Sequence, residues 1–190
     1  MEPVKKFVAE RSELSKHSME IFLRLLTKRK YKKGDILYKS GGTSRKFFII
    51  TKGVARSVLL DKSGHKKTRS LFTASSIFTS LISSLNNEPS EAEFNCLTPC
   101  TIYEGDFKKF IDFTFKYHDI SILYNRFLEE SFFNMEEKAT ILSTLDATER
   151  YLYVKNKIPD LEDLIQLNHI ASYLSITPIQ LSRIRKKLYS

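Results

Sequence analysis

The residues whose types and spacing best suit chemistry lie near the C-terminus, in residues 168–188, which read NHIASYLSITPIQLSRIRKKL. The second half of this segment carries polar and cationic side chains and no acid. Amide, hydroxyl, guanidinium and ammonium groups in such a set bind base edges and phosphates in the major groove of DNA. The side chains that we expect to contact DNA are Thr177, Gln180, Ser182, Arg183, Lys186 and Lys187.

Two short helices would position these side chains. Apolar or small residues recur with a spacing that predicts two helices sharing one buried face. They are Ile170, Ala171, Leu174, Ile176, Leu181, Ile184 and Leu188. Thr177 is a suitable N-cap and Pro178 a suitable first residue for the second helix, while the small Ala171 lets the helices cross steeply. The segment therefore predicts a helix-turn-helix, although its turn carries Ser175 where glycine is usual.

The second helix would present its side chains in different roles. Gln180 can pair with adenine and Arg183 with guanine, whereas Lys186 and Lys187 near the helix end reach phosphates. Arg185 is also expected to point outward. Two simpler interpretations stay open: Arg183 pairs with an acid of the preceding segment, such as Asp163, or the whole hairpin only caps another core.

The distribution of charge divides the chain into three parts. The net charge is +9. Residues 1–70 contain 19 Lys and Arg against 6 Asp and Glu, residues 71–176 contain 8 against 16, and residues 177–190 contain 4 and no acid. The two basic ends suit an anionic polymer and the acidic middle does not, although the first third could equally face an acidic partner.

Several classes of protein are not expected. No stretch reaches the roughly 20 apolar residues of a membrane span, and the first residues have no secretory core, so we expect a cytoplasmic protein. Cys96 and Cys100 are too few for a zinc or iron–sulfur site, so we expect reduced structural cysteines and no metal or cofactor. No nucleophile elbow, phosphate loop or HExxH motif is present, so we expect no enzymatic activity. The histidines, His17, His65, His118 and His169, are isolated from plausible partners in the sequence.

Short runs of alternating residues occupy much of the first half. Residues 18–30 predict a short helix with Ser18 as N-cap. From Gly34 onward, runs of period two predict antiparallel strands, with a hairpin turn at 61–64 and a further strand pair at 92–97 and 101–104. Many short strands at this spacing favour a closed or two-layered β-roll.

A helical pattern follows, first at 107–115 and then over about 119–145. One face of the long helix has apolar residues at alternating spacings of four and three, which predicts a seam that pairs with a second copy. The seam residues are Leu128, Phe132, Met135, Ala139 and Leu142. A helix of this length extends about 40 Å, more than a β-roll could cover, so a homodimer would bury it. The simpler alternative is a helix that packs on its own domain.

Together these patterns predict an α+β fold in three parts. We expect a β-roll sensor domain at 1–117, a long dimerisation helix at 118–145 and a helix-turn-helix DNA-binding domain at 146–190.

The order of these parts resembles that of Crp/Fnr-type transcription regulators. The stretch KKGDILYKSGGTSRKFFIITKGVARSV resembles their glycine-punctuated cyclic-nucleotide-binding jelly roll, with Gly34, Gly41 and Gly53 at turn positions. The stretch ITPIQLSRIRKKL resembles their recognition helix. The resemblance implies a homodimer that binds a palindromic operator in double-stranded DNA and responds to a small-molecule effector.

The effector site departs from the family pattern. The family uses a Gly-Glu pair for the ribose and an Arg-Ser or Arg-Thr pair for the cyclic phosphate, whereas this sequence reads Phe78-Thr79-Ser80 and Pro89-Ser90-Glu91. A buried phosphate needs a paired cation, and a carboxylate would repel it. We therefore expect an effector other than cyclic AMP. The expected pocket residues are Thr79, Ser80, Ser90 and Glu91.

The sequence thus favours a dimeric, sequence-specific DNA-binding transcription regulator. The alternative is a small-molecule sensor or protein-interaction scaffold of the same fold that does not bind DNA. DNA binding predicts an affinity for a duplex that falls steeply with salt, whereas such a scaffold would not bind a duplex.

Overall fold

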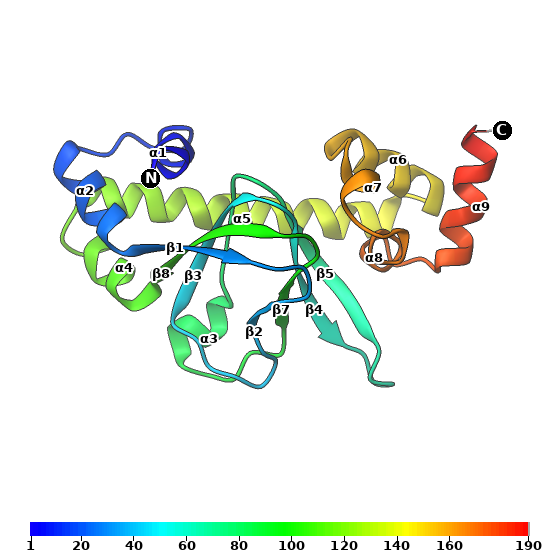
Figure 1. Cartoon of the computed structure of the whole chain (residues 1–190), viewed down its shortest axis with the longest axis horizontal. Helices are drawn as coiled ribbons and strands as arrows, with labels where there is room; N and C mark the ends of the chain where they lie inside the picture. The colour runs from blue at the N-terminus through cyan, green and yellow to red at the C-terminus, as the bar shows by residue number, and fades with distance from the viewer. Residues whose placement is uncertain (190) are drawn as a thin grey trace.

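The chain forms an elongated molecule with a β-roll in the middle and helices at both ends (Figure 1). A computed structural model describes residues 1–189; Ser190, the last residue of the expected DNA-binding segment, lies outside them. The elements are α1 (Glu2–Ala9), α2 (Lys16–Arg24), β1 (Leu26–Tyr31), β2 (Ile36–Tyr38), β3 (Lys46–Lys52), β4 (Ala55–Leu60), β5 (Lys66–Phe72), β6 (Ser76–Phe78), α3 (Leu81–Asn86), β7 (Glu93–Cys96), β8 (Cys100–Asp106), α4 (Phe107–Thr114), α5 (His118–Thr144), α6 (Ala147–Lys157), α7 (Leu161–Leu164), α8 (Leu167–Tyr173) and α9 (Pro178–Tyr189).

Two four-stranded antiparallel sheets build the roll, which confirms the predicted two-layered architecture. One sheet has the order β1-β8-β3-β6 and the other β2-β7-β4-β5. The predicted hairpin joins β4 and β5, and the Asp61 carboxylate stabilises its turn by accepting from the backbone N–H groups of Ser63 and His65. Aromatic rings fill the space between the sheets. They include Tyr38, Phe48, Phe72, Phe78 and Phe94, with the rings of Phe72 and Phe78 stacked 4.1 Å apart.

The predicted pairing of the strands at 92–97 and 101–104 is wrong. Both strands form, but β7 pairs with β2 and β4, whereas β8 pairs with β1 and β3. The chain leaves one sheet and enters the other at the corner between Cys96 and Cys100. Leu97 at this corner is buried among the C-terminal helices rather than inside the roll.

The first predicted helix is displaced from residues 18–30. Helix α2 begins at Lys16, and its N-cap is Ser15, whose Oγ accepts from the backbone N–H of Ser18. The hydroxyl of Ser18 itself donates to Asp119 of α5, at 2.8 Å. The helix ends at Arg24 because residues 26–31 pair with β8 as strand β1. The sequence does not predict the strands β1 and β6 or the helices α1, α3, α6 and α7.

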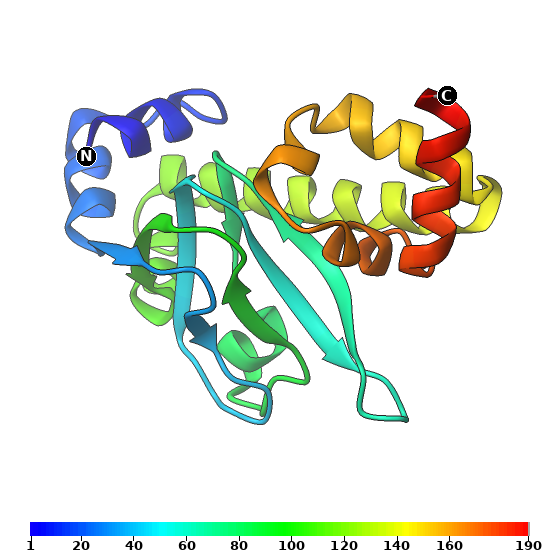
Figure 2. The ribbon, with the colours of Figure 1, turned by 45° about the vertical axis from the view of Figure 1, so that its right-hand side comes forward.

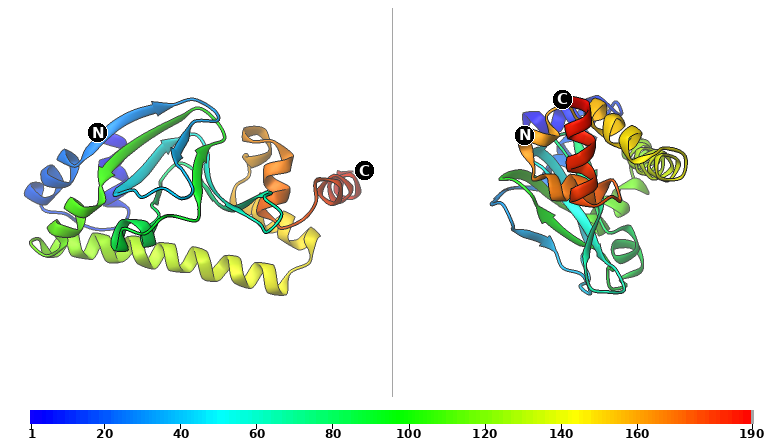
Figure 3. Two further views of the ribbon diagram at one scale, coloured as in Figure 1. Left: turned by 90° about the horizontal axis from the view of Figure 1, so that it is seen from below. Right: turned by 90° about the vertical axis from the view of Figure 1, so that its right-hand side faces the viewer.

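Helix α5 forms where the sequence predicts it, and it links the two ends of the molecule. Its first turns bury Ile120, Leu123 and Phe127 in the core shared with α1, α2 and α4. The helix then continues alongside the roll toward the C-terminal helices (Figure 3). Over this second half the expected seam is exposed, with Phe132 at 63% and Met135 at 60%. No helix within residues 1–189 is long and apolar enough to cross a membrane.

Candidate nucleic-acid interface

Helices α8 and α9 form the predicted helix-turn-helix at the end of the molecule away from α1 (Figure 2). Their crossing buries Ile170, Ala171 and Leu181 completely or almost completely, as expected. The turn begins at Ser175, whose φ of 57° places it in the left-handed region, and the N–H of Ile176 donates to the carbonyl of Ala171 at 3.0 Å. The serine therefore takes the backbone conformation for which glycine is usual.

A reciprocal capping box begins α9. The Oγ1 of Thr177 accepts from the backbone N–H of Gln180 at 3.1 Å, and the Oε1 of Gln180 accepts from the backbone N–H of Thr177 at 2.9 Å. This confirms Thr177 as the N-cap, and Pro178 is the first residue of the helix. The amide oxygen of Gln180 is consequently engaged within the protein, which leaves its amide nitrogen as the free polar group.

The side chains expected to contact DNA are all exposed. They are Thr177, Gln180, Ser182, Arg183, Lys186 and Lys187. The pairing that sequence reasoning left open for Arg183 is made by its neighbour instead, because Nε of Arg185 lies 3.2 Å from Oε1 of Glu162. Arg183 makes no ion pair with any residue that the structure describes. Its guanidinium is therefore available to an external partner.

Two expectations about α9 are wrong. Arg185 was expected to point outward, but it is half-buried against Glu162. Leu188 was expected in the core, but it is 39% exposed. The end of α9 contacts α6 through Tyr189, whose hydroxyl lies 3.0 Å from that of Tyr151.

The core beneath the helix-turn-helix is continuous with the β-roll. Val54 and Leu97 from the roll are buried in the same cluster as residues of α6, α7, α8 and α9. Gly53, which precedes Val54, has a φ of 92°, and a side chain there would collide with Pro99 and Cys100. Helix α8 thus packs against a tightly packed corner of the roll, and we call this contact the seat of α8.

Polar contacts reinforce this seat. Nη1 of Arg56 in β4 donates to Nδ1 of His169 in α8 at 3.0 Å, and the backbone N–H of Thr68 in β5 donates to Oγ of Ser172 at 2.9 Å. The pKa of His169 lies below its ordinary value, first because the ring is partly buried and then because Arg56 and Lys33 are nearby cations. The imidazole is therefore neutral at physiological pH and can accept from Arg56.

Lys138 connects α5, the roll and α8. Its ammonium donates to the backbone carbonyl of Arg69 in β5 and lies 4.0 Å from the ring centre of Tyr173. Burial, followed by the charge of Arg69, lowers the pKa of Lys138 to about 8. Sequence reasoning found neither this lysine nor His169. Arg56 and His169 are 113 positions apart, so no local spacing could signal their contact.

The four residues of the expected effector pocket are partly brought together. Oγ of Ser80 donates to Oγ of Ser90 at 2.9 Å, and Ser90 in turn donates to the carbonyl of Ala92 at 3.0 Å. Thr79 bonds instead to the carbonyl of Lys46 and to Ser84, while Glu91 is exposed. The hydroxyls at this place are therefore satisfied by one another and by backbone groups, without a cation among the four.

Comparisons with known proteins agree with this architecture. Residues 28–117 match the family model described as a cyclic nucleotide-binding domain. FixK2 from Bradyrhizobium japonicum has a similar structure, with a TM-score of 0.74 and 16% identity over 86% of this chain and 84% of that one. The c-di-GMP responsive global regulator CLP of Xanthomonas campestris has a TM-score of 0.69 and 14% identity over 92% and 91% of the two chains. The Catabolite Activator Protein of Thermus thermophilus gives 0.56 and 15% over 92% and 84%. No curated protein matches the sequence.

The fold thus joins an antiparallel β-roll, one long connecting helix and an exposed helix-turn-helix in a single chain. Residues 28–117 match the model of a cyclic nucleotide-binding domain, and the fold of the whole chain resembles that of Crp/Fnr-type regulators. The resemblance seen in the sequence is thereby confirmed.

Proposed function

We propose that this protein is a homodimeric, sequence-specific DNA-binding transcription regulator and not an enzyme. The observation that carries the proposal is the face of α9, which is exposed and free of acids and begins at a well-capped N-terminus. Phosphates and base edges are the natural partners of such a face. In this proposal residues 1–117 sense a signal, 118–145 dimerise and 146–190 bind DNA.

Dimerisation is supported by the exposed part of α5. Phe132, Met135 and Leu142 are large apolar side chains on one face of a helix that reaches past its own core contacts. A second copy would cover this face and would place two copies of α9 for two half-sites of a palindromic operator. The partners proposed are thus a second copy and double-stranded DNA.

We propose that the roll responds to an effector other than cyclic AMP. Thr79, Ser80, Ser90 and Glu91 offer hydroxyls and a carboxylate but no cation for a phosphate. Aromatic rings occupy the space between the sheets. The relative CLP is described as responsive to c-di-GMP, so regulators of this architecture are not restricted to cyclic AMP.

Two measurements test the proposal. Sequencing of genomic fragments retained by the purified full-length protein should yield one motif with two-fold symmetry. Affinity for that motif should fall steeply between 50 and 200 mM salt, and an Arg183→Ala/Lys186→Ala variant should lose most of the binding. An absence of any duplex binding at low salt would favour the scaffold interpretation instead.

A further inference from the structure

A second exposed apolar side chain on α5 faces away from the seam. Phe133 is 63% exposed. Because an α-helix turns by about 100° per residue, Phe133 points about 100° away from Phe132 of the seam. Pairing of two protomers through the seam would therefore leave Phe133 uncovered.

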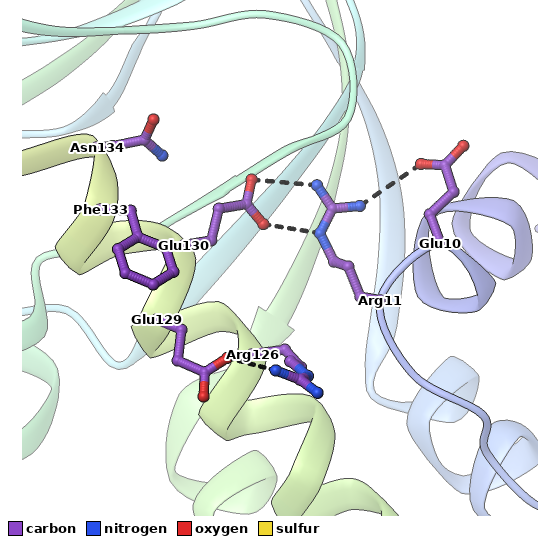
Figure 4. A pocket seen from close by; sticks show the side chains of 7 residues that line it. All are labelled: Glu10, Arg11, Arg126, Glu129, Glu130, Phe133 and Asn134. Atoms are coloured by element: carbon purple, nitrogen blue, oxygen red, sulfur yellow. Dashed lines mark hydrogen bonds and ion pairs between the residues drawn. The ribbon is translucent and has the colours of Figure 1, made fainter. Parts of the chain in front are cut away.

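Two grooves open on either side of Phe133. The first, of about 490 Å³, lies between α5 and the segment that follows α1. Figure 4 shows Phe133 on α5 in this groove, near Arg126 and Glu129, with Glu10 and Arg11 on the opposite wall. The second, of about 530 Å³, lies between α5 and α6 and adds Ile141, Leu145 and Tyr153. We call the two grooves and the phenylalanine between them the Phe133 surface.

The Phe133 surface is acidic. Five carboxylates line the two grooves: Glu10, Glu129, Glu130, Glu136 and Glu137. The lining cations are already bound within the protein. Arg11 is held by Glu130 at 2.8 Å and by backbone carbonyls, and Arg126 is held by Glu129 at 2.8 Å. Glu136 is exposed and forms no ion pair within residues 1–189. Glu137 is paired with Lys157, so the five carboxylates stand against three bound cations, Arg11, Arg126 and Lys157. The excess around the exposed phenylalanine is two negative charges, in a protein whose net charge is +9.

We propose that the Phe133 surface docks a basic segment of another protein, which inserts an apolar side chain beside Phe133. An exposed aromatic ring between grooves is typical of the anchor site of a protein interface. The carboxylates select cationic partners and repel DNA and anionic lipid headgroups. The seam of α5 and the face of α9 are not used, so a protein bound here would be compatible with the proposed dimer and with DNA.

The test uses two fluorescent peptides of equal length as probes, both designed as amphipathic helices with the same leucines. One carries Lys and Arg at its polar positions and the other carries Glu. Fluorescence anisotropy with the full chain should show that the basic peptide binds at least about tenfold more tightly than the acidic one. Phe133→Ser and Glu136→Lys should each weaken binding of the basic peptide about tenfold or more. Ile82→Ser is the matched control, because it removes an equally exposed apolar side chain from α3 and should leave binding unchanged.

Three results would overturn the proposal. Equal binding of the two peptides would show that charge does not select the partner, and equal binding by Phe133→Ser and the unmutated protein would place the contact elsewhere. A monomeric Phe133→Ser protein in light scattering would assign the surface to contact between two copies. Operator binding by Phe133→Ser should remain unchanged, so this test stands apart from the test of DNA binding.

Discussion

Arg183 is the exposed cation of α9 for which base reading is expected. Arg183→Ala should cost about 1 to 3 kcal/mol of operator affinity and flatten the preference at one base pair, because a guanidinium pairs with guanine through two hydrogen bonds. Lys187→Ala, a control on the same helix, should weaken binding to all sequences alike and reduce the salt slope by roughly one. Competition binding on operator variants measures both. If the Arg183→Ala protein kept its full base preference, Arg183 would not be a residue that recognises bases.

Gln180 illustrates how a local contact changes an expected role. Two-point pairing with adenine requires both its amide oxygen and its amide nitrogen. Since the oxygen accepts from the N–H of Thr177, adenine reading would have to break the capping box. We therefore expect Gln180 to contribute less to specificity than Arg183, which forms no ion pair within residues 1–189.

His169 makes the seat of α8 sensitive to acid. The pKa of His169 is lowered in the folded protein, so the unfolded chain takes up this proton first as the pH falls through about 6.5. Stability from the contact with Arg56 is therefore fully present above pH 6.5 and is lost below it. The urea midpoint should drop between pH 7.5 and 5. His169→Gln, which keeps an acceptor but cannot be protonated, should show a smaller drop, and an equal drop would exclude His169 as the cause.

At the scale of the elements, the turn of the helix-turn-helix contains a residue whose backbone conformation lowers the stability of the fold. Ser175 holds a φ of 57°, a conformation that costs an L-residue with a side chain roughly 1 kcal/mol relative to glycine. Ser175→Gly should therefore raise the free energy of unfolding by about that amount. Ser182→Gly is the control, because the same substitution within helical backbone should lower stability by roughly 0.5 kcal/mol. Chemical denaturation of both variants, compared with the unmutated protein, measures the two signs.

Helix α5 should dimerise through its seam alone. Met135→Glu would place two carboxylates across a desolvated contact and should weaken the dimer by about 3 to 5 kcal/mol. Thr140→Glu adds the same charge to the same helix on a face away from the seam and should leave the dimer intact. Light scattering at micromolar concentration reports the mass of each. A monomer for the unmutated protein would contradict the dimer itself.

At the scale of the whole molecule, the roll and the helix-turn-helix share one core. Val54 and Leu97 of the roll are buried with Ala171 and Leu181, and Lys138 of α5 touches both parts. A ligand that shifts the corner at Gly53 or Leu97 would act directly on the seat of α8. In the proposed function, a signal in the roll would reach the DNA-binding helices through this packing.

Cyclic AMP should not provide that signal. Calorimetric titration should detect no binding with a dissociation constant below ~10 μM, because an affinity of nearly 7 kcal/mol would require a cation for the phosphate. Arg45 is the nearby candidate for such a cation, but it is exposed and its side chain lies 3.4 Å from Oδ1 of Asn87. Tight binding of cyclic AMP that disappears in Arg45→Ala would contradict this prediction and identify Arg45 as the residue that binds the phosphate.

Much of the site was readable from the sequence because it depends on neighbours in the chain. The capping box joins Thr177 and Gln180, three positions apart, and the buried face of α8 and α9 follows the helical period. The length of α5 and the existence of most strands followed from periodicity in the same way. The prediction of Ser18 as the N-cap is wrong because Ser15, three positions earlier, caps the helix. The hydroxyl of Ser18 donates instead to Asp119, about a hundred residues away.

Only the tertiary structure decided which segments meet. Strand β1 exists because β8 offers it a pairing edge, and β7 and β8 separate because Leu97 is taken into the core of the C-terminal helices. Arg185, and not Arg183, pairs with an acid, Glu162. Arg56 contacts His169, which lies 113 positions away in the sequence. Helical periodicity and a cap such as that of Thr177 are set by interactions within a few residues, so the sequence alone determines them. Strand partners, buried ion pairs and the seat of one domain on another depend on free energies summed over distant segments, and these are fixed only when the chain is folded.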